Sequence, residues 1–181
     1  MKYYNARRII REELSVDVLS IAIGVFGGLL LNGRVESFIT LPILLAYVPI
    51  INGIGGNVLS VFGSRLGSAL HLGYARGFDR ETSKNMALFV LIAIITFSIA
   101  ALVLYVSNHV SGESMSFRIA FIPVLAGVML VGSLLPLTVL LGLVAYRLGL
   151  DPDNVVISLM TTVADFSGIV FLLLSMRLMG V

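Results

Sequence analysis

Asp165 is the residue of this sequence whose position most strongly suggests chemistry. It lies about ten residues into the last apolar stretch, Val155 to Met176, and therefore near the middle of any membrane that this stretch crosses. A carboxylate at that depth costs roughly 2.5 to 3.5 kcal/mol to insert, and intramembrane acids usually face a cavity or a partner. We therefore interpret Asp165 as a functional group. The alternative is a buried carboxyl that is protonated or paired, although no Lys or Arg lies at mid-membrane depth elsewhere in the sequence.

The residues around this acid form a polar stripe on an otherwise aliphatic helix. Ser158, Thr161, Thr162, Asp165 and Gly168 recur at spacings of three and four, which places them on one helix face. Hard divalent cations take oxygen ligands, and Mg2+ keeps several waters and needs only one or two carboxylates. One Asp165 from each of two chains related by a two-fold axis would supply them.

A second group of polar and small residues interrupts an earlier apolar stretch. Two asparagines and three glycines are poor lipid-facing residues, and glycine permits a helix break that would free backbone carbonyls toward a water-filled path. The alternative is a packing notch with a kink at Pro49, since Gly and Pro are common in membrane helices. The predicted pore-lining residues of this group are Asn52, Gly53, Gly55, Gly56 and Asn57.

The remaining polar residues point less clearly to a site. His71 and His109 fall at the ends of apolar stretches, without an acid at metal-site spacing, and we interpret them as interfacial. Asp17 and Asp151 lie at the starts of the first and last stretches, where they would cap the helices or attract cations to a cytoplasmic vestibule. The chain has no cysteine and no catalytic motif, so we predict that it is not an enzyme.

The elements that must position these residues are membrane helices. Hydrophobic residues make up 58% of the 181 positions and charged residues only 12%, which excludes a soluble domain, and no basic patch suggests a nucleic acid. Each stretch of about 20 apolar residues can cross the membrane, where only helices satisfy the backbone. We predict a short basic amino-terminal segment, 1–13, before an all-α domain, 14–181, with five spans. The predicted spans are Leu14–Leu31, Phe38–Leu72, Asn85–Val106, Phe117–Arg147 and Val155–Met176, the second being one interrupted span.

Basic residues between the spans predict the orientation of the chain. Lys and Arg concentrate on the cytoplasmic side of membrane proteins. With the amino terminus in the cytoplasm and the carboxyl terminus outside the cell, nine basic residues are inside and three outside. The inner set is Lys2, Arg7, Arg8, Arg11, Arg65, Arg76, Arg80, Lys84 and Arg147, and the outer set is Arg34, Arg118 and Arg177.

Two motifs together resemble the membrane domain of the MgtE-type magnesium channels and their eukaryotic solute-carrier relatives. Val48-Pro49 followed by Gly53-Ile54-Gly55-Gly56-Asn57 is similar to the family's V-P and G-x-G-G-N in its second span. Gly149-Leu150-Asp151-Pro152 followed by Thr162-Val163-Ala164-Asp165-Phe166-Ser167-Gly168 resembles its G-x-D-P and T-x-x-D-x-x-G. The resemblance covers nearly the whole chain after the basic segment.

The resemblance implies a five-helix unit that forms its pore as a homodimer in the plasma membrane. The second and fifth helices would line the pore, the aspartate matching Asp165 would hold a hydrated Mg2+, and the residue matching Thr161 would contribute its main-chain carbonyl. The transported ion would be Mg2+, with Mn2+, Co2+ and Zn2+ as alternatives.

The sequence departs from the family pattern in two places, and three functions stay open. About a dozen residues precede the first span, where bacterial members carry a large cytoplasmic sensor domain, so that feedback gate is expected to be absent. Ser158 stands where many members have proline. The alternatives to a Mg2+ channel are an exchanger that couples Mg2+ to Na+ or H+ and a membrane subunit that does not transport.

Overall fold

The computed structural model of the chain is a bundle of helices, and no strand occurs in the residues that it describes. These are residues 6–75, 77–112, 115–150 and 152–181, without the side chains at 6–13, 15–16 and 152–155. The helices are α1 (Ala6–Asn32), α2 (Val35–Thr40), α3 (Ile43–His71), α4 (Arg80–Val110), α5 (Phe117–Arg147) and α6 (Pro152–Met179).

Four of these helices are long and apolar enough to cross a membrane, namely α3, α4, α5 and the Val156–Met179 part of α6. The helix α1 has 27 residues, but its described apolar part, Asp17–Asn32, is shorter than a full span. The prediction of an all-α polytopic membrane protein is therefore confirmed. The fifth span, through α1, stays a prediction.

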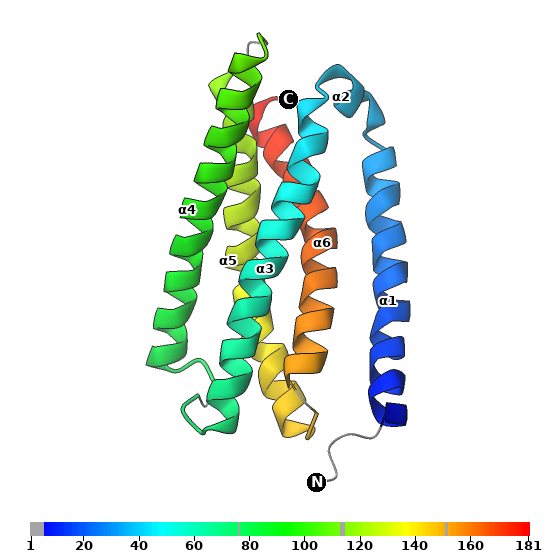
Figure 1. The fold of residues 1–181 in the computed structure, drawn as a ribbon, viewed down its shortest axis with the longest axis vertical. Helices are drawn as coiled ribbons and strands as arrows, with labels where there is room; N and C mark the ends of the chain where they lie inside the picture. The colour runs from blue at the N-terminus through cyan, green and yellow to red at the C-terminus, as the bar shows by residue number, and fades with distance from the viewer. Residues whose placement is uncertain (1–5, 76, 113–114, 151) are drawn as a thin grey trace.

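The long helices run side by side in alternating directions. As Figure 1 shows, α1, α4 and α6 run one way and α3 and α5 the other, so α1 begins at the end of the bundle opposite to the carboxyl terminus. The helix α6 packs against α1, α3 and α5, whereas α4 packs against α3 and α5. The polar stripe of α6 is thus carried by a helix that packs against three of the other long helices.

The interruption of the second predicted span lies before the glycine-rich segment. Leu41 separates α2 from α3 with φ −131° and ψ 81°, an extended backbone that suits a residue followed by proline. From Ile43 to His71 the helix is continuous, with Pro49 in its interior. Of the two alternatives for the glycine-rich segment, the helix break with free carbonyls does not occur. Neighbouring helices accommodate proline and glycine within a membrane helix.

Close contacts between apolar side chains hold the helices together. Phe97 of α4 is fully buried, and its ring lies where a side chain on Gly127 of α5 would be. The rings of Phe62 and Phe89 meet edge to face across α3 and α4, with their centroids 5.3 Å apart. Tyr47 donates a hydrogen bond of 2.9 Å to the main-chain oxygen of Ile119.

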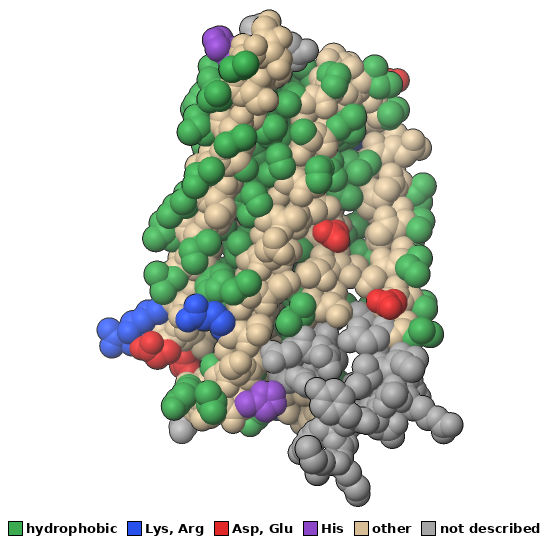
Figure 2. All heavy atoms as spheres, in the orientation of Figure 1, with side chains coloured by type: hydrophobic (Ala, Val, Ile, Leu, Met, Phe, Trp, Pro, Cys, Tyr) green, Lys and Arg blue, Asp and Glu red, His purple; other side chains and the backbone are tan. Residues whose placement is uncertain are grey.

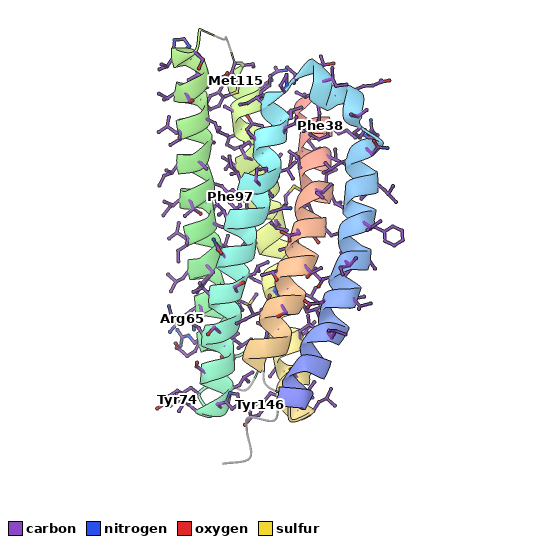
Figure 3. The ribbon with its side chains drawn as sticks, turned by 45° about the vertical axis from the view of Figure 1, so that its right-hand side comes forward. Phe38, Arg65, Tyr74, Phe97, Met115 and Tyr146 are labelled. Carbon is purple, nitrogen blue, oxygen red and sulfur yellow. The ribbon has the colours of Figure 1, made fainter. Side chains whose placement is uncertain are left out.

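The two ends of the bundle carry the aromatic and charged residues that membrane interfaces favour. Figure 3 shows Tyr74 and Tyr146 at one end and Phe38 and Met115 at the other. In Figure 2, Lys and Arg gather where α3 and α4 meet near the first of these ends, while hydrophobic side chains cover the middle. This pattern is typical of a helix bundle whose middle lies in the hydrocarbon core of a membrane.

Candidate cation site

Asp165 lies near the middle of α6, and its side chain is exposed in the single chain. In the described part of the chain it forms no hydrogen bond or ion pair with another residue. The alternative of a carboxylate buried against a basic residue therefore has no support among the described residues. Figure 2 shows acidic groups on α6 and α1 on one face of the bundle.

The helix α3 approaches α6 closely on both sides of Asp165. A Cβ added to Gly168, one turn after Asp165, would collide with Oδ1 of Asn52. One turn before Asp165, the position of a Cβ on Gly56 would be 3.9 Å from Cγ2 of Thr161. Because α3 and α6 are antiparallel, these two contacts bracket the carboxylate in height and place Asn52 and Gly56 beside it.

Asn52 carries a polar atom with no partner in the described structure. Its Oδ1 is buried against Gly168 and accepts no hydrogen bond. A buried carbonyl oxygen without a donor costs free energy, roughly 1 to 3 kcal/mol, so such groups are uncommon in folded proteins. The atom lies on the α3 side of the Asp165 region and is closed in by Gly168.

The other predicted pore-lining residues of α3 divide into two groups. Gly53 and Asn57, one turn apart, are exposed in the single chain, and no atom lies within 4 Å of a Cβ built on Gly53. Gly55 is buried, and a Cβ on it would collide with Leu130 of α5. The structure therefore places Gly53 and Asn57 on the outer face of α3 and Gly55 in the packing against α5.

The two threonine hydroxyl groups of the α6 stripe form hydrogen bonds within the protein. Thr161 donates to the main-chain oxygens of Ile157 and Ser158 at 3.1 and 2.9 Å, and Thr162 donates to Ser158 at 3.1 Å. The Thr162 hydroxyl also shares a bond of 2.6 Å with the Ser20 hydroxyl of α1. These contacts leave the Asp165 carboxylate as the free polar side chain of the stripe's middle turn.

The sequence analysis did not identify Ser20 as a site residue. A single hydroxyl in the first apolar stretch is a weak signal, because such groups often bond to their own helix. In the structure its hydroxyl joins α1 to Thr162 of α6, one turn before Asp165.

The predicted vestibule is described only in part. Asp17 is exposed on α1, one turn before Ser20. Because α1 and α6 run in the same direction, Asp17 lies closer than Asp165 to the end of the bundle where α6 begins. Asp151 lies outside the described residues. His71 bonds to the main-chain oxygen of Gly67 at 2.9 Å, and His109 stacks on Tyr105, so both histidines are engaged at helix ends.

The arrangement offers one carboxylate per chain, together with the side-chain amides of α3. In the described residues no three Asp, Glu or His side chains come together as a metal-binding group. One carboxylate with neutral oxygens suits an ion that keeps most of its water, as Mg2+ does, better than an ion that needs a full protein cage.

Comparisons with known proteins indicate the family of the chain. Residues 48–175 match the sequence model of the MgtE family, described as a divalent cation transporter. Solute carrier family 41 member 2 of Mus musculus is 26% identical over 96% of this chain and 33% of the relative, and the Homo sapiens protein gives the same three values. The Xenopus laevis protein is 25% identical over 99% of this chain and 35% of the relative.

The chain spans about a third of the length of these curated relatives. No solved structure matches it.

Proposed function

The chain belongs to the MgtE family of divalent cation transporters, and we propose that it carries Mg2+ across the plasma membrane as a homodimer. The path runs between α3 and α6 of the two copies, and two Asp165 carboxylates hold a largely hydrated ion.

The observation that carries this proposal is the exposed, unpaired Asp165 carboxylate near the middle of a membrane helix. A charge facing hydrocarbon at that depth is strongly disfavoured, whereas a charge facing a wet cavity is tolerated. The exposed side of Asp165 therefore faces water and ions.

A second copy is the partner that encloses this water. Gly53 and Asn57 on α3 are exposed like Asp165 on the neighbouring α6, so polar and small residues form part of the outer surface of the single chain. Lipid offers these groups no hydrogen bonds. When two such surfaces face each other around a two-fold axis, the two Asp165 carboxylates lie on opposite sides of the gap. The exposed Asn57 side chains are then also removed from contact with lipid.

Mg2+ fits this gap as a hydrated ion. It gives up its water reluctantly, so the two Asp165 carboxylates bind it through its water shell. The membrane potential supplies about 2.3 kcal/mol per charge per 100 mV, and about twice that for a divalent ion. Because the cytoplasmic side of the plasma membrane is negative, this potential drives the ion inward.

The test is Mg2+ flux into liposomes that contain the purified protein, measured with an Mg2+-sensitive dye inside. Asp165→Asn should abolish the flux because the amide removes the negative charge from the middle of the path. Glu36→Gln is the matched control, since Glu36 is an exposed acid on α2 away from this path, and its flux should equal that of the wild type.

Full Mg2+ flux through a folded Asp165→Asn protein would remove the central role of this residue. Flux that requires an opposing Na+ or pH gradient would identify an exchanger instead of a channel. Flux that is absent from the purified wild type and appears with a partner would identify a subunit.

A further inference from the structure

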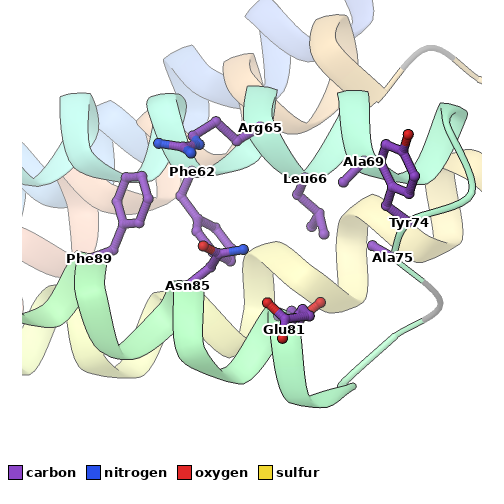
Figure 4. A pocket seen from close by; sticks show the side chains of 10 residues that line it. Phe62, Arg65, Leu66, Ala69, Tyr74, Ala75, Glu81, Asn85 and Phe89 are labelled. Atoms are coloured by element: carbon purple, nitrogen blue, oxygen red, sulfur yellow. The ribbon is translucent and has the colours of Figure 1, made fainter.

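A cavity of about 450 Å3 opens between α3 and α4 at the end of the bundle where α4 begins. It is separate from the α3–α6 face that carries Asp165. Figure 4 shows the side chains that line it, with Phe62, Arg65 and Leu66 on α3 and Glu81, Asn85 and Phe89 on α4. The cavity therefore has both charged and apolar walls.

The polarity of the walls changes along the bundle. Tyr74, Glu81 and Asn85 line the part near the helix ends, whereas Phe62 and Phe89 meet edge to face at the other extreme of the cavity. Phe62 lies nine residues before His71, the last residue of α3, which is about 13 Å along the helix. The cavity thus reaches from the membrane interface into the apolar layer.

Arg65 is the unpaired charge of this cavity. In the described part of the chain it has no ion pair, while the acid that shares the cavity, Glu81, is bound by Lys84 at 2.8 Å. Figure 4 shows the Arg65 guanidinium turned toward Phe89 and away from Glu81. Arg65 lies six residues from the end of α3, about 9 Å along the helix, so its charge is below the helix end.

An unpaired guanidinium at that depth needs an anion that can itself reside in a membrane. Cations near membrane helix ends are stabilised by headgroup phosphates, and basic pockets between helices on the cytoplasmic side bind anionic lipid headgroups. The guanidinium fork matches two phosphate oxygens. Leu66, Phe62 and Phe89 offer an apolar wall to an acyl chain below the phosphate.

We infer that this cavity binds an anionic phospholipid, with the lipid phosphate on Arg65 and an acyl chain along Phe62 and Phe89. The inference is independent of the ion that the protein carries. Its occupant is a lipid and not a soluble anion, because half of the cavity is apolar and opens at the depth of the bilayer.

The test is the number of phosphatidylglycerol molecules retained by the purified full chain in detergent, measured by native mass spectrometry beside phosphatidylcholine. The wild type should retain phosphatidylglycerol in preference to phosphatidylcholine. Arg65→Gln should lower the affinity for phosphatidylglycerol about fivefold, the change expected for one basic contact with a headgroup. The control Arg118→Gln removes an exposed Arg at the opposite end of the bundle and should retain phosphatidylglycerol as the wild type does.

A second variant keeps the test independent of the loss of Arg65. Asn85→Asp adds a negative charge to an exposed position in the cavity wall, and should lower phosphatidylglycerol retention while phosphatidylcholine retention stays constant. Wild-type retention in either variant would overturn the inference. Displacement of phosphatidylglycerol by inorganic phosphate would also overturn it, because the occupant would then be a soluble anion.

Discussion

Gly168 allows α3 to pack closely against α6 because it has no side chain. A Cβ at this position would collide with Oδ1 of Asn52 and would lie 3.2 Å from Cγ2 of Ile51. Ile51 is fully buried and has no room to move. The close approach of α3 to α6 beside Asp165 therefore depends on glycine at this position.

We expect Gly168→Ala to destabilise the protein by about 1 to 3 kcal/mol, the usual range for an added methyl group in a packed contact. Thermal unfolding of the purified protein in detergent measures the effect. The control is Gly132→Ala on α5, where a Cβ meets no atom within 4 Å, so this variant should be as stable as the wild type or slightly more stable. Equal melting temperatures for the two variants would show that α3 and α6 are farther apart than the structure has them.

The sequence allowed some of these residues to be identified and not others. Asp165 was identifiable because a charged residue in an apolar membrane helix costs insertion free energy, and this can be recognised without knowing which residues contact it. The contacts of Asn52 with Gly168 and of Ser20 with Thr162 join residues more than a hundred positions apart. Their pairing depends on how the helices are arranged, and no spacing within one helix records it.

The α4 and α5 helices fit together through one aromatic ring and one glycine. Phe97 is fully buried, and three of its ring atoms occupy the space that a side chain on Gly127 would need. A buried ring cannot rotate away without opening a gap elsewhere in a close-packed interior. The distance between these two helices is set at this contact.

Gly127→Ala should destabilise the protein by about 1 to 3 kcal/mol through this overlap. Phe97→Leu in the same chain should restore part of the loss, because the smaller side chain leaves room for the added methyl group. The four melting temperatures of a double-mutant cycle measure this coupling. Additive losses in the double variant would contradict the contact between Phe97 and Gly127.

The helical nature of the elements followed from the sequence, while the position of one interruption did not. Long apolar stretches predict helices because the bilayer admits little else. In the second stretch, three glycines suggested a break near Gly53, but the chain leaves the helix at Leu41, before Pro42. The effect of proline on the residue before it decides this position, whereas glycine only permits a break.

The whole molecule is a bundle whose ends differ in charge and whose outer surface includes Gly53, Asn57 and Asp165. The membrane class of the protein followed from composition. The proposed assembly of two copies has no comparable signal in one sequence, because a helix face that meets another protein resembles one that meets lipid.

The absence of cysteine from the chain permits a direct test of the homodimer. In Gly53→Cys, the new thiol should be joined to that of a second copy by a short thiol-reactive cross-linker, giving a dimer on a denaturing gel. Leu102→Cys, at an exposed position on α4, is the control and should stay monomeric. Equal cross-linking at both positions would indicate random collisions, and none at Gly53 would argue against α3 at the two-fold axis.

The placement of α1 has a mechanical consequence. This helix packs extensively on α6 alone among the long helices, through Gly27 against Ile169 and through the Ser20 hydroxyl. The main contacts of α1 are therefore with the helix that carries Asp165, while α3, α4 and α5 pack against one another. A displacement of α1 would therefore change the position of α6, one wall of the proposed ion path, before that of α3.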